Sequence, residues 1–323
     1  MKDEPMSNDE LIPLDPPQPL ASAPLAYENP GFLNSSDGRI VRILAEYSEP
    51  LARFRHERIQ DTVVFFGSAR FRALDDAAHE LELLENTGSQ RPAPPEEQPA
   101  RAREGRAGVS PLRLRRAEAA VEMARYYEDA RKLAHLLTEW SMGLKSHRHR
   151  FVVTSGGGPG IMEAANRGAF EAGGKTIGLN IRLPFEQQPN RYITPALNFE
   201  FHYFFMRKYW FAYLAKALVV FPGGFGTLDE MFEILTLSQT NKLAKKIGIV
   251  VYGSSYWKQV IDLDVLVQKG SISPKDRQLF QFADTPEEAF TLLRDGLIHN
   301  HLEREELWRE GEMELPEIAH TRR

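Results

Sequence analysis

The sequence predicts an α/β fold: a doubly wound, Rossmann-like parallel sheet with helices on both faces. Short apolar runs rich in Val, Ile and Phe alternate with amphipathic stretches along most of the chain, which is the pattern of strands joined by crossover helices. Three of these runs end in glycine-containing turns, at Gly67-Ser68, Gly156–Gly160 and Gly223–Thr227. Because the carboxyl ends of parallel strands meet at one edge of a sheet, where ligands bind, we expect the three turns to lie together.

The expected strands are runs in which β-branched and aromatic residues dominate. They are 62–66, 151–154, 176–180, 199–202, 216–221 and 247–251. Between them, apolar residues recur at three- and four-residue spacing, which predicts helices. The expected helices are 73–85, 117–140, 160–172, 203–214, one that opens at Thr227, 255–268 and 286–298.

This domain accounts for only part of the chain. Residues 1–37 are rich in proline and lack a periodic apolar face, so we expect a disordered segment there. Residues 38–60 are predicted to form an N-terminal helix. The Rossmann-like domain is expected at 61–298, interrupted at 86–111 by a flexible insertion in which prolines and charges break the periodicity. Residues 299–323 are charged and are expected to form a solvated tail.

The composition narrows the class of protein. The chain has 323 residues, of which 42% are apolar, so it can bury a full core. Its net charge of −5 argues against general nucleic-acid binding, and the absence of cysteine excludes disulfides, thiolate metal sites and a cysteine nucleophile. The N-terminus lacks the apolar region of a signal peptide, and no apolar run reaches the ~18 residues that a membrane helix needs. We therefore expect a cytoplasmic protein with no membrane partner.

The stretch from Pro222 to Glu230 is the most informative part of the chain. A buried apolar strand leads into Pro-Gly-Gly-Phe-Gly-Thr, and a helical pattern follows. Glycine lets the backbone approach a ligand closely, and the N–H groups of a first helical turn attract anions, so we predict a phosphate site with Glu230 at its rim. Thr227 and Glu230 also fit a capping box, in which both side chains serve only the helix end. A helix start alone does not need three glycines, which favours a ligand, although the two roles are compatible.

Other nucleotide chemistries and a metal site fit less well. The dinucleotide fingerprint requires glycine at position 161, which is Ile161, and no acidic residue ends the third strand. A P-loop for phosphoryl transfer requires a lysine before Thr227, where the chain has Gly226. The basic run 145–150 contains two histidines but no further ligands at suitable spacing, so we assign no metal.

The helix expected at 203–214 is aromatic on nearly every side, yet it contains Arg207 and Lys208. We interpret its aromatic residues as core and subunit interface. Isolated buried charges are costly, so the two cations should meet a phosphate, a carboxylate or solvent. Lys208 can equally extend along the helix surface to water.

Three segments together resemble the LOG family, the cytokinin riboside 5'-monophosphate phosphoribohydrolases and related bacterial nucleotide nucleosidases, formerly labelled lysine decarboxylases. The segments are Ser155-Gly-Gly-Gly-Pro-Gly-Ile-Met162, Met206-Arg207-Lys208, and Pro222-Gly-Gly-Phe-Gly-Thr-Leu-Asp-Glu230. The similarity runs in order from about Thr62 to Leu297, and the pattern PGGxGTxxE is its specific element. It implies hydrolysis of the N-glycosidic bond of a nucleoside 5'-monophosphate to free base and ribose 5-phosphate. It also implies a homodimer, or a higher oligomer built from dimers, and no metal or organic cofactor.

The resemblance also implies roles for matching residues. Arg207 corresponds to the catalytic arginine and Glu230 to the catalytic glutamate. The residues that match substrate-binding positions are Gly157, Gly158, Met162, Lys208, Gly223, Gly224, Gly226 and Thr227. The N-terminal helix, the insertion and both tails have no place in the shortest family members. The chain is therefore similar to the longer bacterial type, for which AMP is the expected substrate.

The implied chemistry agrees with the residue types. Breaking a ribosyl C–N bond builds positive charge on the sugar, which the carboxylate of Glu230 can stabilise while it orients or activates water. Arg207 can hold the phosphate or help neutralise the leaving side, and the loop amides can fix the 5'-phosphate. Related proteins of the same fold bind nucleotides or molybdenum cofactor without turnover. A binding or carrier protein, in which Glu230 only caps a helix, therefore stays open as the alternative.

Overall fold

The computed structural model of the chain describes residues 21–89, 110–184, 188–243 and 245–305. The chain divides into two compact units, one ending at Ala45 and the other beginning at Glu46. Helix α2 (Arg39–His56) spans this boundary and agrees with the N-terminal helix expected at 38–60.

The N-terminal unit differs from the expected disorder in one place. A 3-10 turn, η1 (Ala26–Glu28), precedes the short helix α1 (Pro30–Leu33). Asn29 caps α1 by accepting a hydrogen bond from the backbone N–H of Phe32, and Pro30 occupies the first helical turn. Asparagine followed by proline is a favoured helix start, which explains the helix without an apolar face. Residues 1–20, for which disorder was also expected, lie outside the described residues.

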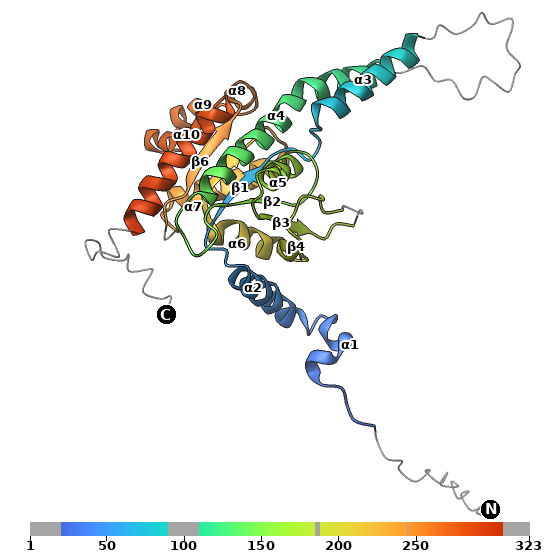
Figure 1. The fold of residues 1–323 in the computed structure, drawn as a ribbon, viewed down its shortest axis with the longest axis vertical. Helices are drawn as coiled ribbons and strands as arrows, with labels where there is room; N and C mark the ends of the chain where they lie inside the picture. Colours follow the sequence, from blue (N-terminus) through green and yellow to red (C-terminus); the bar gives the residue numbers. More distant parts are fainter. Residues whose placement is uncertain (1–20, 90–109, 185–187, 244, 306–323) are drawn as a thin grey trace, which may run out of the picture. The chain divides into compact units, whose positions relative to one another are not determined.

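The strands of the second unit form a seven-stranded parallel sheet (Figure 1). In spatial order they are β4 (Asn198–Phe201), β3 (Thr176–Ile181), β2 (Val152–Ser155), β1 (Thr62–Phe66), β5 (Ala215–Val220), β6 (Gly248–Tyr252) and β7 (Gln281–Ala283). The predicted doubly wound α/β fold is thereby confirmed. Strand β7 was not predicted, because three residues at a sheet edge carry too little periodicity to be distinguished from a loop.

Helices cover both faces of the sheet. They are α3 (Leu74–Ser89), α4 (Pro111–Met142), α5 (Ile161–Glu171), α6 (Phe204–Leu214), α7 (Phe225–Gln239), α8 (Ser254–Val260), α9 (Leu263–Gln268) and α10 (Pro286–Leu297). Helices α4, α5 and α10 pack on the face that carries Val63 and Phe65. Helix α6 packs on the opposite face, where the rings of Phe66 and Phe211 lie 4.9 Å apart.

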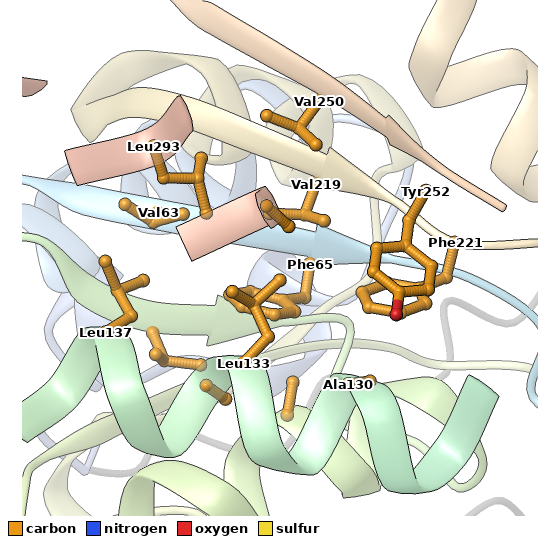
Figure 2. Packing of buried hydrophobic residues seen from close by; sticks show 14 of the residues in the cluster. Val63, Phe65, Ala130, Leu133, Leu137, Val219, Phe221, Val250, Tyr252 and Leu293 are labelled. Carbon is orange, nitrogen blue, oxygen red and sulfur yellow. The ribbon is translucent and has the colours of Figure 1, made fainter. Parts of the chain in front are cut away.

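The core is built from strands that are buried on both faces. Figure 2 shows residues of the central strands, and Phe221 directly after β5, against helices α4 and α10. The strand residues are Val63, Phe65, Val219, Val250 and Tyr252, and the helix residues are Ala130, Leu133, Leu137 and Leu293. Every residue of β1 is buried, as expected for a parallel strand between two helical layers. The core therefore holds β1 and β5 in fixed positions side by side.

Several boundaries differ from those expected. The helices beside the insertion reach Ser89 and begin at Pro111, so the break expected at 86–111 is shorter on its N-terminal side, and 90–109 lie outside the described residues. Ser110 starts α4 by accepting a hydrogen bond from the N–H of Arg113. The helix expected at 255–268 is two helices, because Ile261 is extended and Asp262 caps α9.

The solvated tail expected from residue 299 begins later than predicted. A π-helical turn, η6 (Ile298–Leu302), buries His301. Glu305 then accepts hydrogen bonds from Arg150, which also pairs at 2.8 Å with the fully buried Asp61. Burial raises the pKa of Asp61, and the charge of Arg150 opposes that shift. A buried arginine requires carboxylate partners, so this triad holds the chain to the domain as far as Glu305.

Gly168 permits the close packing of α4 and α5. A Cβ atom at this position would lie 1.9 Å from the backbone oxygen of Arg131. We expect Gly168→Ala to separate the helices and to reduce the free energy of unfolding by about 1–3 kcal/mol. Urea denaturation measures this loss. Gly296→Ala in α10 is the matched control, because its nearest neighbour is 4.0 Å away, and an unchanged midpoint for Gly168→Ala would contradict the packing argument.

Candidate functional site

The three glycine turns meet at the carboxyl ends of β2, β1 and β5, which are consecutive in the sheet. The backbone N–H of Ser68 donates to the oxygen of Pro222 at 3.0 Å, and the N–H of Ile161 donates to the oxygen of Ser68 at 3.0 Å. The chain also changes direction across the sheet here, because β1 to β4 extend to one side and β5 to β7 to the other. Open α/β sheets bind ligands at such a switch point.

Two glycines of the 156–160 turn are required by the backbone. Gly157 and Gly160 have φ of +75° and +72°, values that side chains with a Cβ rarely adopt. A Cβ at Gly160 would lie 2.3 Å from the oxygen of Ser68, and one at Gly157 would lie 2.3 Å from the side chain of Asn180. The turn thus packs directly against the neighbouring turn and against β3.

The glycine turn at 223–227 differs from the expectation in the position of its helix start. Helix α7 begins at Phe225, with Gly224 as its N-cap and no side-chain cap. Thr227 is therefore inside the first turn, and the capping-box interpretation of Thr227 and Glu230 is wrong. Gly224 and Gly226 are exposed, and a Cβ at either would meet open space. The N–H groups of a first helical turn lack partners within the helix, so this end of α7 is suited to an anion.

Glu230 lies one turn further along α7 and is buried, with 8% of its surface exposed. Burial raises the pKa of its carboxyl to about 7, although the positive charges of Lys208 and Arg207 oppose the shift. Within the described part of the chain, its carboxylate has no hydrogen-bond partner. A buried, titratable carboxylate that no protein group satisfies is typical of a functional site.

Arg207 of α6 is held beside the glycine turn at 156–160. Its Nε donates to the oxygen of Leu179 at 2.7 Å, and its guanidinium lies 4.9 Å from the ring centroid of Phe211. A Cβ at Gly156 would come within 2.5 Å of the guanidinium. Burial lowers the pKa of Arg207, and the Glu230 carboxylate opposes that shift. The two predicted catalytic residues are therefore close enough for each charge to act on the other.

Lys208 meets carboxylates rather than open solvent. Its Nζ lies 2.8 Å from Asp229 and 2.8 Å from Glu233, both of α7. Burial by itself lowers the pKa of Lys208, but the hydrogen bonds to Asp229 and Glu233 outweigh it, so the pKa is raised. A substrate contact by Lys208 stays a prediction. The positive charge of Lys208 is already paired with two acidic residues.

A cavity of about 660 Å³ adjoins Arg207. Its lining includes the predicted residues Met162 and Arg207, together with Gly156. It also includes residues that the sequence did not single out, which are Glu49, Arg53, Ala69, Asn180, Ile181, Pro189, Asn198, Phe199 and Glu200. The ends of β3 and β4 could have been suspected, because they share the carboxyl edge, whereas no pattern pointed from α2 to this cavity.

The backbone of Gly157 and Gly158 is held by a small hydrogen-bond network around Asn190, which we call the polar latch. The Asn190 side chain donates to the oxygens of both, at 3.1 Å each. It also donates at 2.9 Å to Asn166, which is completely buried. The latch fixes the backbone of the glycine turn from which substrate contacts are predicted.

Two further properties concern the described residues only. They contain no group of three or more His, Asp or Glu side chains that could hold a metal ion. No helix among them is both long enough and apolar enough to span a membrane.

Part of this chain is similar in sequence to known proteins. Residues 162–293 match the family model described as "Possible lysine decarboxylase". The chain is 27% identical over 144 residues to "Probable cytokinin riboside 5'-monophosphate phosphoribohydrolase LOG6" of Arabidopsis thaliana, covering 45% of this chain and 71% of that protein. It is 29% identical over 149 residues to "Cytokinin riboside 5'-monophosphate phosphoribohydrolase LOG1" of the same plant, covering 45% and 67%. The residues matched by the family model include Met162, Arg207 and Glu230 and leave out α2.

Solved structures also show similarity to this chain. The "Moco Carrier Protein" from Chlamydomonas reinhardtii is 20% identical, with 54% of this chain and 89% of that chain covered and a TM-score of 0.37.

The buried carboxylate of Glu230 should make the free energy of unfolding depend on pH. The pKa of Glu230 is about 7 in the folded protein against an ordinary 4.5, so folding loses stability as the pH rises through this window. Glu230→Gln removes that loss and should stabilise the protein more at pH 8 than at pH 5, with a difference on the order of 3 kcal/mol. Urea unfolding at the two pH values measures it.

The control for this measurement is Glu118→Gln, since Glu118 is exposed on α4. Its effect should be equal at pH 5 and pH 8. If Glu230→Gln also has the same effect at both, the carboxyl of Glu230 does not titrate near pH 7 in the folded protein.

Proposed function

We propose that the chain, which is 27–29% identical to LOG-family phosphoribohydrolases over 45% of its length, hydrolyses the N-glycosidic bond of a nucleoside 5'-monophosphate. The products are the free base and ribose 5-phosphate. The observation that carries the proposal is the buried carboxylate of Glu230, which has a pKa of about 7 and no hydrogen-bond partner among the described residues, beside Arg207 at the switch point of the sheet.

The phosphate of the substrate is assigned to the start of α7. Gly224 and Gly226 are exposed at the positive end of the helix dipole, and the buried residues Gly223 and Thr227 complete the turn. A Cβ at Gly223 would lie 2.1 Å from Oγ1 of Thr227, so the turn keeps its shape only with glycine there. Binding of the phosphate supplies the energy that positions C1' of the ribose.

Glu230 then acts at the ribose. Its ionised carboxylate stabilises the positive charge that develops on the sugar as the C–N bond breaks. It also orients the water whose hydroxyl adds to C1' and accepts the proton that this water releases. The departing base takes up a proton from solvent, and Glu230 then returns its proton to solvent, which restores the carboxylate. A carboxyl with a pKa near 7 is ionised in a useful fraction at neutral pH and is still basic enough to accept a proton.

Arg207 supports the same step from the other side. Its hydrogen bond to the backbone oxygen of Leu179 and its contact with the ring of Phe211 fix the guanidinium next to the glycine turn at 156–160. From there it binds the phosphate or stabilises the departing base. Gly157, Gly158 and Met162 form the adjacent wall of the substrate pocket, with Lys208 as a further substrate contact.

AMP is the proposed substrate, because the extended N-terminal and C-terminal segments make the chain similar to the longer bacterial members of the family. The proposal includes no metal or organic cofactor. The alternative is a protein of the same fold that binds a nucleotide or molybdenum cofactor without turnover. That alternative treats Glu230 as a helix cap, and the N-cap of α7 is Gly224.

The catalytic assignment is tested by incubating the purified protein with AMP, CMP, GMP and UMP and separating the products by chromatography. We expect the wild type to release free base, AMP being the best substrate. Glu230→Gln and Arg207→Ala should each lower kcat by roughly 100-fold or more. Glu118→Gln serves as the control with unchanged activity.

Two results would contradict the assignment. Full turnover by Glu230→Gln would remove the catalytic role of that carboxylate. Tight binding of AMP by the wild type without release of base from any nucleotide would favour the carrier alternative.

The proposed enzyme is a homodimer or a larger assembly of dimers. Large apolar side chains are exposed near the candidate site, with Phe225 at 93%, Phe204 at 55% and Phe205 at 50%. Such side chains on a soluble surface favour a subunit interface. Light scattering of the purified chain should give at least twice the monomer mass of 36.8 kDa, and Phe205→Asp should shift the assembly towards a monomer; a monomeric wild type would disprove this assembly.

A further inference from the structure

The cavity beside Arg207 has one wall that comes from outside the matched family region. Helix α2 contributes Glu49 and Arg53, which are one helical turn apart, and the family model begins only at residue 162. Gly156, Met162 and Arg207 line the same cavity. A ligand in this cavity would therefore touch both α2 and the predicted catalytic arginine.

Arg53 is fixed rather than free in this wall. Its guanidinium donates to the backbone oxygens of Ala196 at 3.3 Å and Asn198 at 2.9 Å, and it lies 3.9 Å from the ring centroid of Phe199. It also donates to Oε2 of Glu49 at 3.1 Å. Arg53 thus connects β4 to α2 and determines where the Glu49 carboxylate is held.

Two partly exposed carboxylates line this end of the cavity. Glu49 and Glu200 are 55% and 58% exposed. The side-chain nitrogen of Asn180 donates to Asn198 and to the oxygen of Phe199. The side-chain oxygen of Asn180 is directed towards the glycine turn at 156–160, since it is the nearest atom to a Cβ built at Gly157. Glu49 pairs with Arg53 and Glu200 with Arg182, and their exposed carboxylate oxygens remain available to a ligand group that bears N–H donors.

The two ends of the site consequently differ in the ligand that they favour. The start of α7 offers backbone N–H groups to an anion, and the α2 end offers carboxylate oxygens to a donor. Arg207 adjoins the cavity at one side and interacts with Glu230 at the other. Because Arg207 both lines the cavity and interacts with Glu230, a nucleotide with its phosphate at α7 and its C1' near Glu230 is assigned a base position in this cavity.

Resting on the proposed function, we propose that Glu49 is a specificity-determining residue that accepts a hydrogen bond from the exocyclic amino group of the base, and that Arg53 is its positioning residue. The chemical class of substrate is an aminopurine nucleotide. No bond is made or broken by these residues. They act by making binding of a 6-aminopurine more favourable than binding of a purine without that group.

The experiment compares AMP with purine riboside 5'-monophosphate, which lacks only the 6-amino group. For the wild type, kcat/KM should be higher for AMP. Glu49→Ala should reduce the ratio of the two kcat/KM values by about 5- to 10-fold, the size expected for a hydrogen bond to a charged group that is partly exposed. Arg53→Ala should reduce the same ratio, because the carboxylate is then no longer held in place.

Controls separate recognition from structure. Arg55→Ala alters an exposed residue of the same helix and should leave the ratio unchanged. Glu49→Gln keeps the size of the side chain and an acceptor oxygen, so it should retain part of the preference. A ratio unchanged in both Glu49 variants, or equal losses for both nucleotides, would overturn the proposal, because a structural defect lowers both values alike.

Recognition of the 6-amino group by Glu49 can be tested separately from turnover. If the wild type hydrolyses neither nucleotide, calorimetric titration with AMP and with purine riboside 5'-monophosphate still tests the cavity. Tighter binding of AMP by the wild type, with that preference lost in Glu49→Ala, would support the assignment of Glu49 even in a protein without turnover. Equal affinities of the wild type for the two ligands would refute it.

Discussion

The guanidinium of Arg207 can lie over the end of β2 only because residue 156 has no side chain. A Cβ there would approach the guanidinium to 2.5 Å and the sulfur of Met162 to 2.6 Å. The bond to the oxygen of Leu179 then ties the arginine to β3. From this position the same cation interacts with Glu230 on one side and lines the α2 cavity on the other. The geometry of the whole candidate site depends on this single close approach.

Charge is distributed unevenly around that arginine. Lys208, its neighbour on α6, is engaged by Asp229 and Glu233. Glu230 lies between these two acidic residues in sequence but faces inward, where burial outweighs the attraction of both cations and raises its pKa to about 7. The helix thus separates a paired, partly exposed set of charges from one buried carboxylate whose charge changes near neutral pH. Such separation of environments lets adjacent acidic residues differ in chemical role.

Helix α2 combines packing and polar functions on adjacent positions. The ring of Phe54 lies 4.8 Å from that of Phe199 and 5.3 Å from that of Trp210, which anchors the helix to β4 and α6. Arg53 bonds the backbone of the same strand, and Glu49 is held by Arg53. The part of α2 from Glu46 onward is therefore an integral wall of the domain, and the anchoring that stabilises it also sets the position of a carboxylate at the cavity.

The sequence by itself determined the fold class, six of the strands and the meeting of the three glycine turns, because short continuous apolar runs and the glycines that end them are local signals. It also singled out Arg207 and Glu230 as the residues to examine. Only the tertiary structure decided that α7 begins at Phe225, so that Glu230 is no helix cap, and that Lys208 is paired with carboxylates. It alone placed Glu49 and Arg53 beside Arg207, more than 150 residues away in the chain. Burial, pKa and cavity walls arise from contacts between distant segments, and no local pattern of residues encodes them.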